Sequence, residues 1–225
     1  MTKRISKQLN SFKYKGEPIK ITIGTLILTV FCILLLIVAT FTQISFSHFY
    51  LPYNTLTLIN QGLSNSDFTT YFIKNYRYIP QIPIVFFIIA LLGRKFGILA
   101  IFLYIILGMF FPIFALGGGI SYLFEYGFGY ILAFIPAIFF SGTLLKVKTD
   151  FLRIILLSTL GVIAIHILGV LYMLFIATLK HASMDLITSW ILSQSGVQIF
   201  YDIFFSILAI YLGRISRKIL WIIMC

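Results

Sequence analysis

Long runs of apolar residues are the feature that most constrains this chain. A helix needs roughly 20 apolar residues to cross the hydrocarbon core of a bilayer. Six stretches reach or approach that length: 21–41, 80–93, 96–116, 123–145, 151–179 and 196–213. Only 10% of the residues are charged, whereas soluble domains carry about 25%. The sequence therefore predicts an all-α integral membrane protein with six transmembrane helices in the lipid bilayer.

The distribution of basic residues predicts the orientation of these helices. If the N-terminus is cytoplasmic, only three of the 17 lysines and arginines fall outside, namely Lys74, Arg77 and Lys180. Cytoplasmic loops of membrane proteins are enriched in basic residues. We therefore expect both termini inside the cell, in a multi-pass protein of the plasma membrane. The net charge of +11 is explained by this asymmetry, and we expect no nucleic-acid partner.

Three regions follow from this topology. Residues 1–20 form a basic cytoplasmic N-terminal segment, residues 21–218 a single six-helix membrane domain, and residues 219–225 a C-terminal tail. A long outer loop, at 42–79, separates the first two helices. The alternative for the start of the chain is a signal peptide. Against this alternative, the first apolar run is longer than the core of a usual signal peptide, and no clear small-x-small cleavage site follows it.

Polar residues recur every fourth position around the sixth stretch. Gln194, Gln198, Asp202 and Ser206 would share one helical face at this spacing, with Tyr201 beside them. Polar groups at membrane depth usually face the interior of a bundle or a cavity. Asp202 is the only acid within a predicted helix core. Either it bonds a neighbouring helix, or it contacts a ligand that enters from outside; we favour the ligand.

The stretch "PIFALGGGISYLFEYGFGYILAF" at 112–134 interrupts the apolar pattern near the outer surface. Consecutive glycines let a ligand approach main-chain groups closely, and a plain flexible turn is the alternative. Together with the Asp202 face and the outer loop, this turn predicts an outward-facing site for a small polar solute. Its candidate residues outside the sixth stretch are Gly117, Gly118, Gly119, Tyr122, Glu125, Arg77 and Gln81. The role of Glu125 stays open among ligand contact, pairing with Arg77 or Lys180, and solvation.

Two further features favour structural roles. Gly129, Ala133, Ala137 and Ser141 recur every fourth residue, and small residues at this spacing let two helices approach closely. Their partner is either another span of this chain or an external membrane subunit. His166 lies near the middle of the fifth stretch, and we expect it to be a hydrogen-bonded core residue, with a proton relay as the alternative.

Catalytic and metal-binding motifs are absent from the sequence. It contains no His-Glu-x-x-His motif, no pair of aspartates within spans and no phosphate-binding loop. We therefore expect neither an enzyme nor a metal or other cofactor. A binding subunit that draws its energy from elsewhere fits better than a self-contained transporter.

The chain also resembles the BioY-type biotin transporter family in several segments. These are the start "YIPQIP", then "LLGRKFG", "LYIILG", "PIFALGGG" and "FGYILAF", and later "GVQIFYDIFFS". Members are substrate-binding S components of energy-coupling factor transporters. The resemblance implies a six-helix fold that binds biotin near the outer surface, with a transmembrane coupling subunit and an ATPase pair as partners.

The resemblance also implies roles for individual residues. Asp202 would accept hydrogen bonds from the ureido N–H groups of biotin, with Gln198, Tyr201 or the glycine-turn backbone as complementary partners. Many members have a lysine three residues after this aspartate, where this chain has Phe205. The ligand carboxylate would then pair with Arg77, Lys74 or a backbone nest. The alternative function is a non-transporting membrane scaffold or assembly protein.

Overall fold

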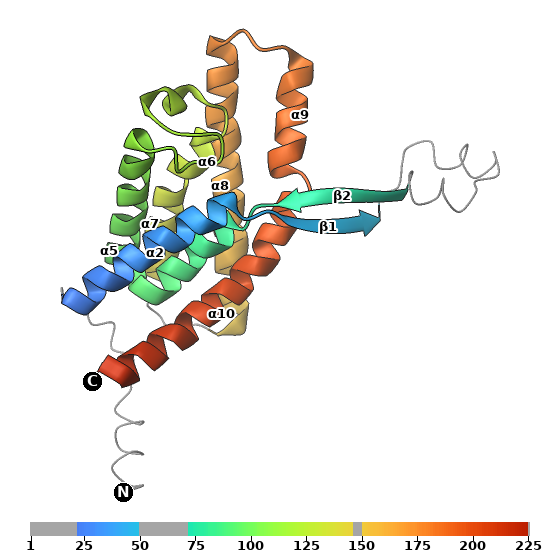
Figure 1. Cartoon of the computed structure of the whole chain (residues 1–225). Helices are drawn as coiled ribbons and strands as arrows, with labels where there is room; N and C mark the ends of the chain where they lie inside the picture. Colours follow the sequence, from blue (N-terminus) through green and yellow to red (C-terminus); the bar gives the residue numbers. More distant parts are fainter. Residues whose placement is uncertain (1–21, 50–71, 146–149, 225) are drawn as a thin grey trace, which may run out of the picture.

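The computed structural model describes residues 22–49, 72–145 and 150–224 (Figure 1). The predicted N-terminal segment and residues 50–71 of the outer loop lie outside these ranges. The described part is mostly helical, in the order α2 (Ile23–Phe41), β1 (Ile44–Phe49), β2 (Ile73–Tyr78), α5 (Gln81–Phe110), η1 (Ile120–Phe124), α6 (Phe128–Leu132), α7 (Phe134–Leu144), α8 (Phe151–Leu179), α9 (Met184–Ser195) and α10 (Gln198–Met224).

Four helical segments of the described part are long and apolar enough to cross a membrane. They are Ile23–Phe41, Gln81–Phe110, Phe151–Leu179 and Met184–Leu220, and a shorter apolar helix covers Phe128–Thr143. Large apolar side chains point outward from these helices, as a lipid environment requires. The count of six spans and the cytoplasmic position of both termini stay predictions.

Helix α5 is a hairpin of two limbs that turns at Gly93. The backbone there adopts φ 74° and ψ −178°, a conformation that is essentially restricted to glycine. The Nε2 of Gln81 lies 3.0 Å from the hydroxyl of Tyr104, although 23 residues of straight helix would span about 35 Å. The limbs therefore run antiparallel, and they correspond to the predicted stretches 80–93 and 96–116.

A β-ribbon corrects the prediction of an all-helical chain. β1 and β2 pair antiparallel, with Ile44 opposite Tyr78 and Phe46 opposite Tyr76. They extend to one side of the helices in Figure 1. Both strands lie in the segment that we predicted as an outer loop. Alternating side chains place Tyr76 and Tyr78 on one face of β2 and Arg77 on the other.

The predicted polar row of the sixth stretch is broken between two helices. α9 ends at Ser195, and Gly196 follows it in a non-helical conformation. Gln194 therefore belongs to α9, whereas Asp202 and Ser206 belong to α10. Helix α9 is also an element that the sequence analysis did not predict. α10 continues to Met224, through most of the segment that we assigned to a tail.

The row of small residues in α6 and α7 packs within the chain. A Cβ on Gly129 would lie 2.3 Å from the Cβ of Tyr172 in α8, so α6 and α8 are in close contact. Ala133, Ala137 and Ser141 are all buried, and Ser141 lies near Gly161 of α8. Helix α8 is therefore the neighbour of both ends of this row, at Gly129 and at Ser141.

Candidate functional site

Asp202 is a fully buried carboxylate where α10, α8 and β2 meet. The hydroxyl of Tyr78 donates to its Oδ1 at 2.9 Å. The Nε2 of His166 lies 3.1 Å from its Oδ2, and Gln198 is also hydrogen-bonded to it. Removing a carboxylate from water is costly unless it is hydrogen-bonded. These three partners explain how Asp202 is accommodated at 0% exposure.

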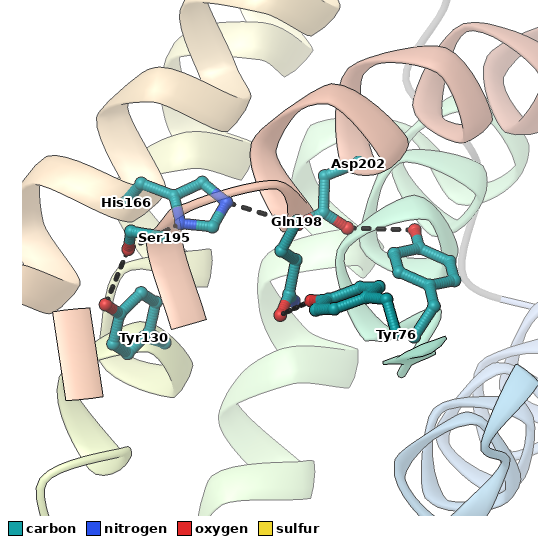
Figure 2. Close-up of polar contacts among 7 residues, drawn as sticks. Tyr76, Tyr130, His166, Ser195, Gln198 and Asp202 are labelled. Carbon is teal, nitrogen blue, oxygen red and sulfur yellow. Dashed lines mark hydrogen bonds and ion pairs between the residues drawn. The ribbon is translucent and has the colours of Figure 1, made fainter. Parts of the chain in front are cut away.

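A chain of hydrogen bonds continues from Asp202 through His166 (Figure 2). The Nδ1 of His166 lies 3.0 Å from the Oγ of Ser195, the last residue of α9. Ser195 Oγ is in turn 2.7 Å from the hydroxyl of Tyr130 in α6. The chain therefore links α6, α9, α8 and α10, and Tyr78 extends it to β2.

An aromatic cluster covers the ribbon side of Asp202. The rings of Tyr76 and Tyr201 stack with centroids 5.7 Å apart and an interplanar angle of 6°. Phe46 stacks on Tyr201 at 4.9 Å, and Phe205 stacks on Tyr78 at 5.3 Å. Tyr76 also donates to Oε1 of Gln198 at 2.9 Å. Offset stacking of this kind stabilises by about 0.5–1.5 kcal/mol per pair, which holds the ribbon on α10.

The hydroxyl groups of the ribbon are hydrogen-bond donors at physiological pH. Burial raises the pKa of both Tyr76 and Tyr78 well above its usual value, and the nearby Asp202 carboxylate raises it further. A phenol beside a carboxylate keeps its proton because a second negative charge would be repelled. Tyr78 therefore acts as a donor, and Asp202 as the acceptor.

The glycine turn is a closed, hydrogen-bonded structure. Phe114 and Gly117 exchange two backbone hydrogen bonds, at 2.8 and 3.0 Å, and Gly119 N–H donates to the carbonyl of Gly108 at 2.9 Å. A Cβ on Gly118 would lie 2.1 Å from the carbonyl oxygen of Phe111. Glycine is therefore required at Gly118 for close packing. The buried ring of Tyr122 packs against Phe114 at 4.6 Å.

Glu125 and Gln81 do not share the surroundings of Asp202, and each has hydrogen-bond or ion-pair partners of its own. The carboxylate of Glu125 is 3.8 Å from Nζ of Lys180, just beyond α8. His166 precedes Lys180 by 14 residues, which is about 21 Å along a helix. Gln81 donates to Thr40 Oγ1 and Tyr104 Oη at 2.6 and 3.0 Å, and so ties α2 to both limbs of α5.

The expected site residues therefore separate into groups. Asp202, Gln198 and Tyr201 lie together, whereas Arg77 is exposed on the opposite face of β2. Sequence reasoning missed Tyr76, Tyr78 and Ser195, and it gave His166 no part in the site. The alternation in "YRY" at 76–78 was the available signal for a strand that places two tyrosines on one face.

Ser206 is a further polar residue on the buried face of α10. Its hydroxyl is fully buried and finds no hydrogen-bond partner in the described ranges. Such an atom calls for an explanation in a native structure. In the same ranges, no three His, Cys, Asp or Glu side chains gather closely enough to hold a metal ion.

The chain is similar to known proteins in both sequence and fold. The family model described as the BioY family matches residues 75–220. A crystal structure titled as the S-component for biotin from an ECF-type ABC transporter has a similar fold, with a TM-score of 0.59. Its sequence is 20% identical, and the match covers 88% of this chain and 95% of that one. No curated protein sequence matches this chain.

Proposed function

Because this chain belongs to the BioY family, we propose that it captures biotin as the membrane-embedded, substrate-binding subunit of an energy-coupling factor transporter. Members of the family are transporter subunits rather than enzymes. The similar fold of a biotin S-component supports this assignment. The observation that carries it is the buried Asp202 carboxylate, which lies within the matched segment and is hydrogen-bonded to side chains of two other elements.

The chemistry of a cyclic urea suits this position. An ionised carboxylate offers about four acceptor sites, and the protein partners of Asp202 leave capacity for a ligand N–H. The carbonyl of the urea needs a donor, and we assign this role to the unpaired hydroxyl of Ser206. Ser206 follows Asp202 by four residues, so both side chains lie on one face of α10.

The fatty-acid side chain of biotin requires an apolar surface. Phe46, Tyr201 and Phe205 provide one next to Asp202. Phe205 stands where many relatives have a lysine, and it contributes a ring instead of a cation. We also propose that the ligand contacts residues nearer the outer surface. These are Gly117, Gly118, Gly119, Tyr122, Glu125, Arg77 and Gln81.

The remaining parts of the proposal concern transport. We place six spans in the plasma membrane with both termini in the cytoplasm, so that biotin is taken from the outside. A transmembrane coupling subunit and a pair of ATPases would drive its release inward. ATP-dependent uptake of labelled biotin by cells that contain all these subunits tests this part.

The alternative role as a membrane scaffold has lost its main support. That reading depended on the small-residue row of α6 and α7 as a surface for an external partner. The row is buried within the chain, and α8 packs against its two ends, with Gly129 against Tyr172 and Ser141 near Gly161. The structure thus gives no specific reason to favour the scaffold.

Binding of labelled biotin to the purified protein tests the proposed function. We expect saturable binding, and we expect Asp202→Asn to weaken it by about tenfold or more, the size of one hydrogen bond to a charged group. Asp185→Asn is the matched control, because Asp185 is an exposed acid in the first turn of α9. Equal affinity in the parent and Asp202→Asn would contradict the assignment of the site.

A further inference from the structure

His166 contacts the proposed ligand-binding carboxylate through one ring nitrogen and the end of α9 through the other. It is buried, with 3% exposure. Three elements place polar groups against its ring: α10 with Asp202, α9 with Ser195, and α6 with Tyr130, whose ring packs edge-on at 5.7 Å. Since each nitrogen has one partner, the position of the imidazole proton decides the direction of every hydrogen bond in the chain.

Two directions are possible for a neutral imidazole. In the first, Nε2–H donates to Asp202, while Ser195 O–H donates to Nδ1 and Tyr130 O–H donates to Ser195. Every donor in the chain then has an acceptor. In the second direction, Nδ1–H donates to Ser195 and Ser195 donates to Tyr130, so the Tyr130 O–H has no acceptor within the described ranges. Asp202 would also need a proton of its own to donate to Nε2.

The contacts of Asp202 favour the first direction. The Tyr78 hydroxyl already donates to Oδ1, and a second donor at Oδ2 completes the stabilisation of a buried anion. A buried donor without an acceptor costs more than the hydrogen bond itself contributes. Tyr130 is only half-buried, so the first direction avoids part of this cost there.

We propose that His166 is a positioning residue for biotin binding, held as the neutral Nε2–H tautomer by Ser195 and Tyr130. In this tautomer it donates to Oδ2 of Asp202 and fixes the carboxylate plane, so that the remaining acceptor site faces a ligand N–H group. Helix α9 thereby gains a role in recognition. It has no buried residue, yet its last residue sets the proton position on His166. This inference rests on the proposed function of Asp202.

Two substitutions at one position separate this role from simple packing. The amide nitrogen of glutamine reaches the place of Nε2, whereas that of asparagine reaches the place of Nδ1. His166→Gln keeps a donor for Asp202, and we expect affinity for biotin within about threefold of the parent. His166→Asn keeps only the contact with Ser195, and we expect a loss of about tenfold or more, as for a hydrogen bond to a charged group.

The controls make each outcome decisive. Ser193→Ala, an exposed hydroxyl of α9 that bonds the carbonyl of Trp190, should leave affinity unchanged. Equal affinities in the Gln and Asn variants, or tighter binding by Asn, would overturn the positioning role. If Asp202→Asn loses binding in the same assay, the proposed function still stands. If Asp202→Asn binds normally, the proposed site itself is wrong.

A measurement on the parent protein covers the case in which the variants do not fold. Nitrogen-15 NMR of labelled histidines distinguishes a protonated from an unprotonated ring nitrogen. We expect the His166 signals to show a protonated Nε2 and an unprotonated Nδ1 at neutral pH. A proton on Nδ1, alone or together with Nε2, would overturn the proposal.

Discussion

The hydroxyl of Tyr78 and the carboxylate of Asp202 form a hydrogen bond of 2.9 Å between residues 124 positions apart. It joins the end of the β-ribbon to the first turns of α10, and neither side chain is exposed. The ribbon is thereby fixed to the element that carries the proposed site. This contact closes the ribbon side of the Asp202 site, and it provides one of the hydrogen bonds that stabilise the buried carboxylate.

Removal of the Tyr78 hydroxyl should destabilise the protein. Tyr78→Phe leaves the buried carboxylate with one donor fewer, and a hydrogen bond to a charged group contributes about 1.5–3 kcal/mol. We expect a lower unfolding temperature in detergent by thermal denaturation. Tyr126→Phe is the control, since it removes the same group from a partly exposed ring beside Lys180. Equal effects of the two substitutions would contradict the importance of the Tyr78 contact.

The turn of the α5 hairpin should tolerate only glycine. At φ 74° and ψ −178°, an alanine at position 93 would be strained by about 1–3 kcal/mol. Gly127→Ala provides a matched control, because Gly127 has φ −78° and its Cβ would come no closer than 3.9 Å to another residue. We expect a clear loss of thermal stability for Gly93→Ala and almost none for Gly127→Ala. A tolerated alanine at position 93 would show that the limbs turn elsewhere.

Much of the helical framework could be predicted from apolar runs alone. α2, α8 and both limbs of α5 correspond to predicted stretches, because each must bury its backbone hydrogen bonds in an apolar medium. The ribbon was missed because long loops were expected to be irregular, and only the short pieces "ISFS" and "YRY" of its strands alternate. Helix α9 was missed because its break from α10 depends on a single glycine, Gly196.

Only part of the candidate site could be predicted from the sequence. Asp202 and Gln198 could be found, since polar residues at helical spacing stand out in an apolar chain. Tyr78 and Ser195 could not, because their contacts join elements that are distant in sequence and whose register no local pattern specifies. Each of these residues looks like an ordinary interfacial tyrosine or loop serine until the fold places it.

The pair formed by Glu125 and Lys180 should contribute little to stability. Both side chains are 40% exposed and their charged atoms are 3.8 Å apart, and exposed pairs of this kind contribute about 0–1 kcal/mol. Lys180→Gln should therefore shift the unfolding temperature only slightly, and added salt should reduce even that shift. A large loss of stability would instead mean that Lys180 has a further buried partner.

Alkaline pH should destabilise the segment that carries the glycine turn. Burial raises the pKa of Tyr122, in the short helix η1, from 10.0 to about 12. The folded state therefore holds this proton more tightly than the unfolded state. The resulting stabilisation is complete below about pH 10, and it is lost as the pH rises through the folded pKa. Unfolding therefore becomes easier between these two pH values.

We expect denaturant unfolding to show a shallower pH dependence in Tyr122→Phe than in the parent over this window. Tyr76 and Tyr78 also have raised pKa values, so some dependence should persist. Identical slopes for parent and variant would contradict the buried, protonated state of Tyr122.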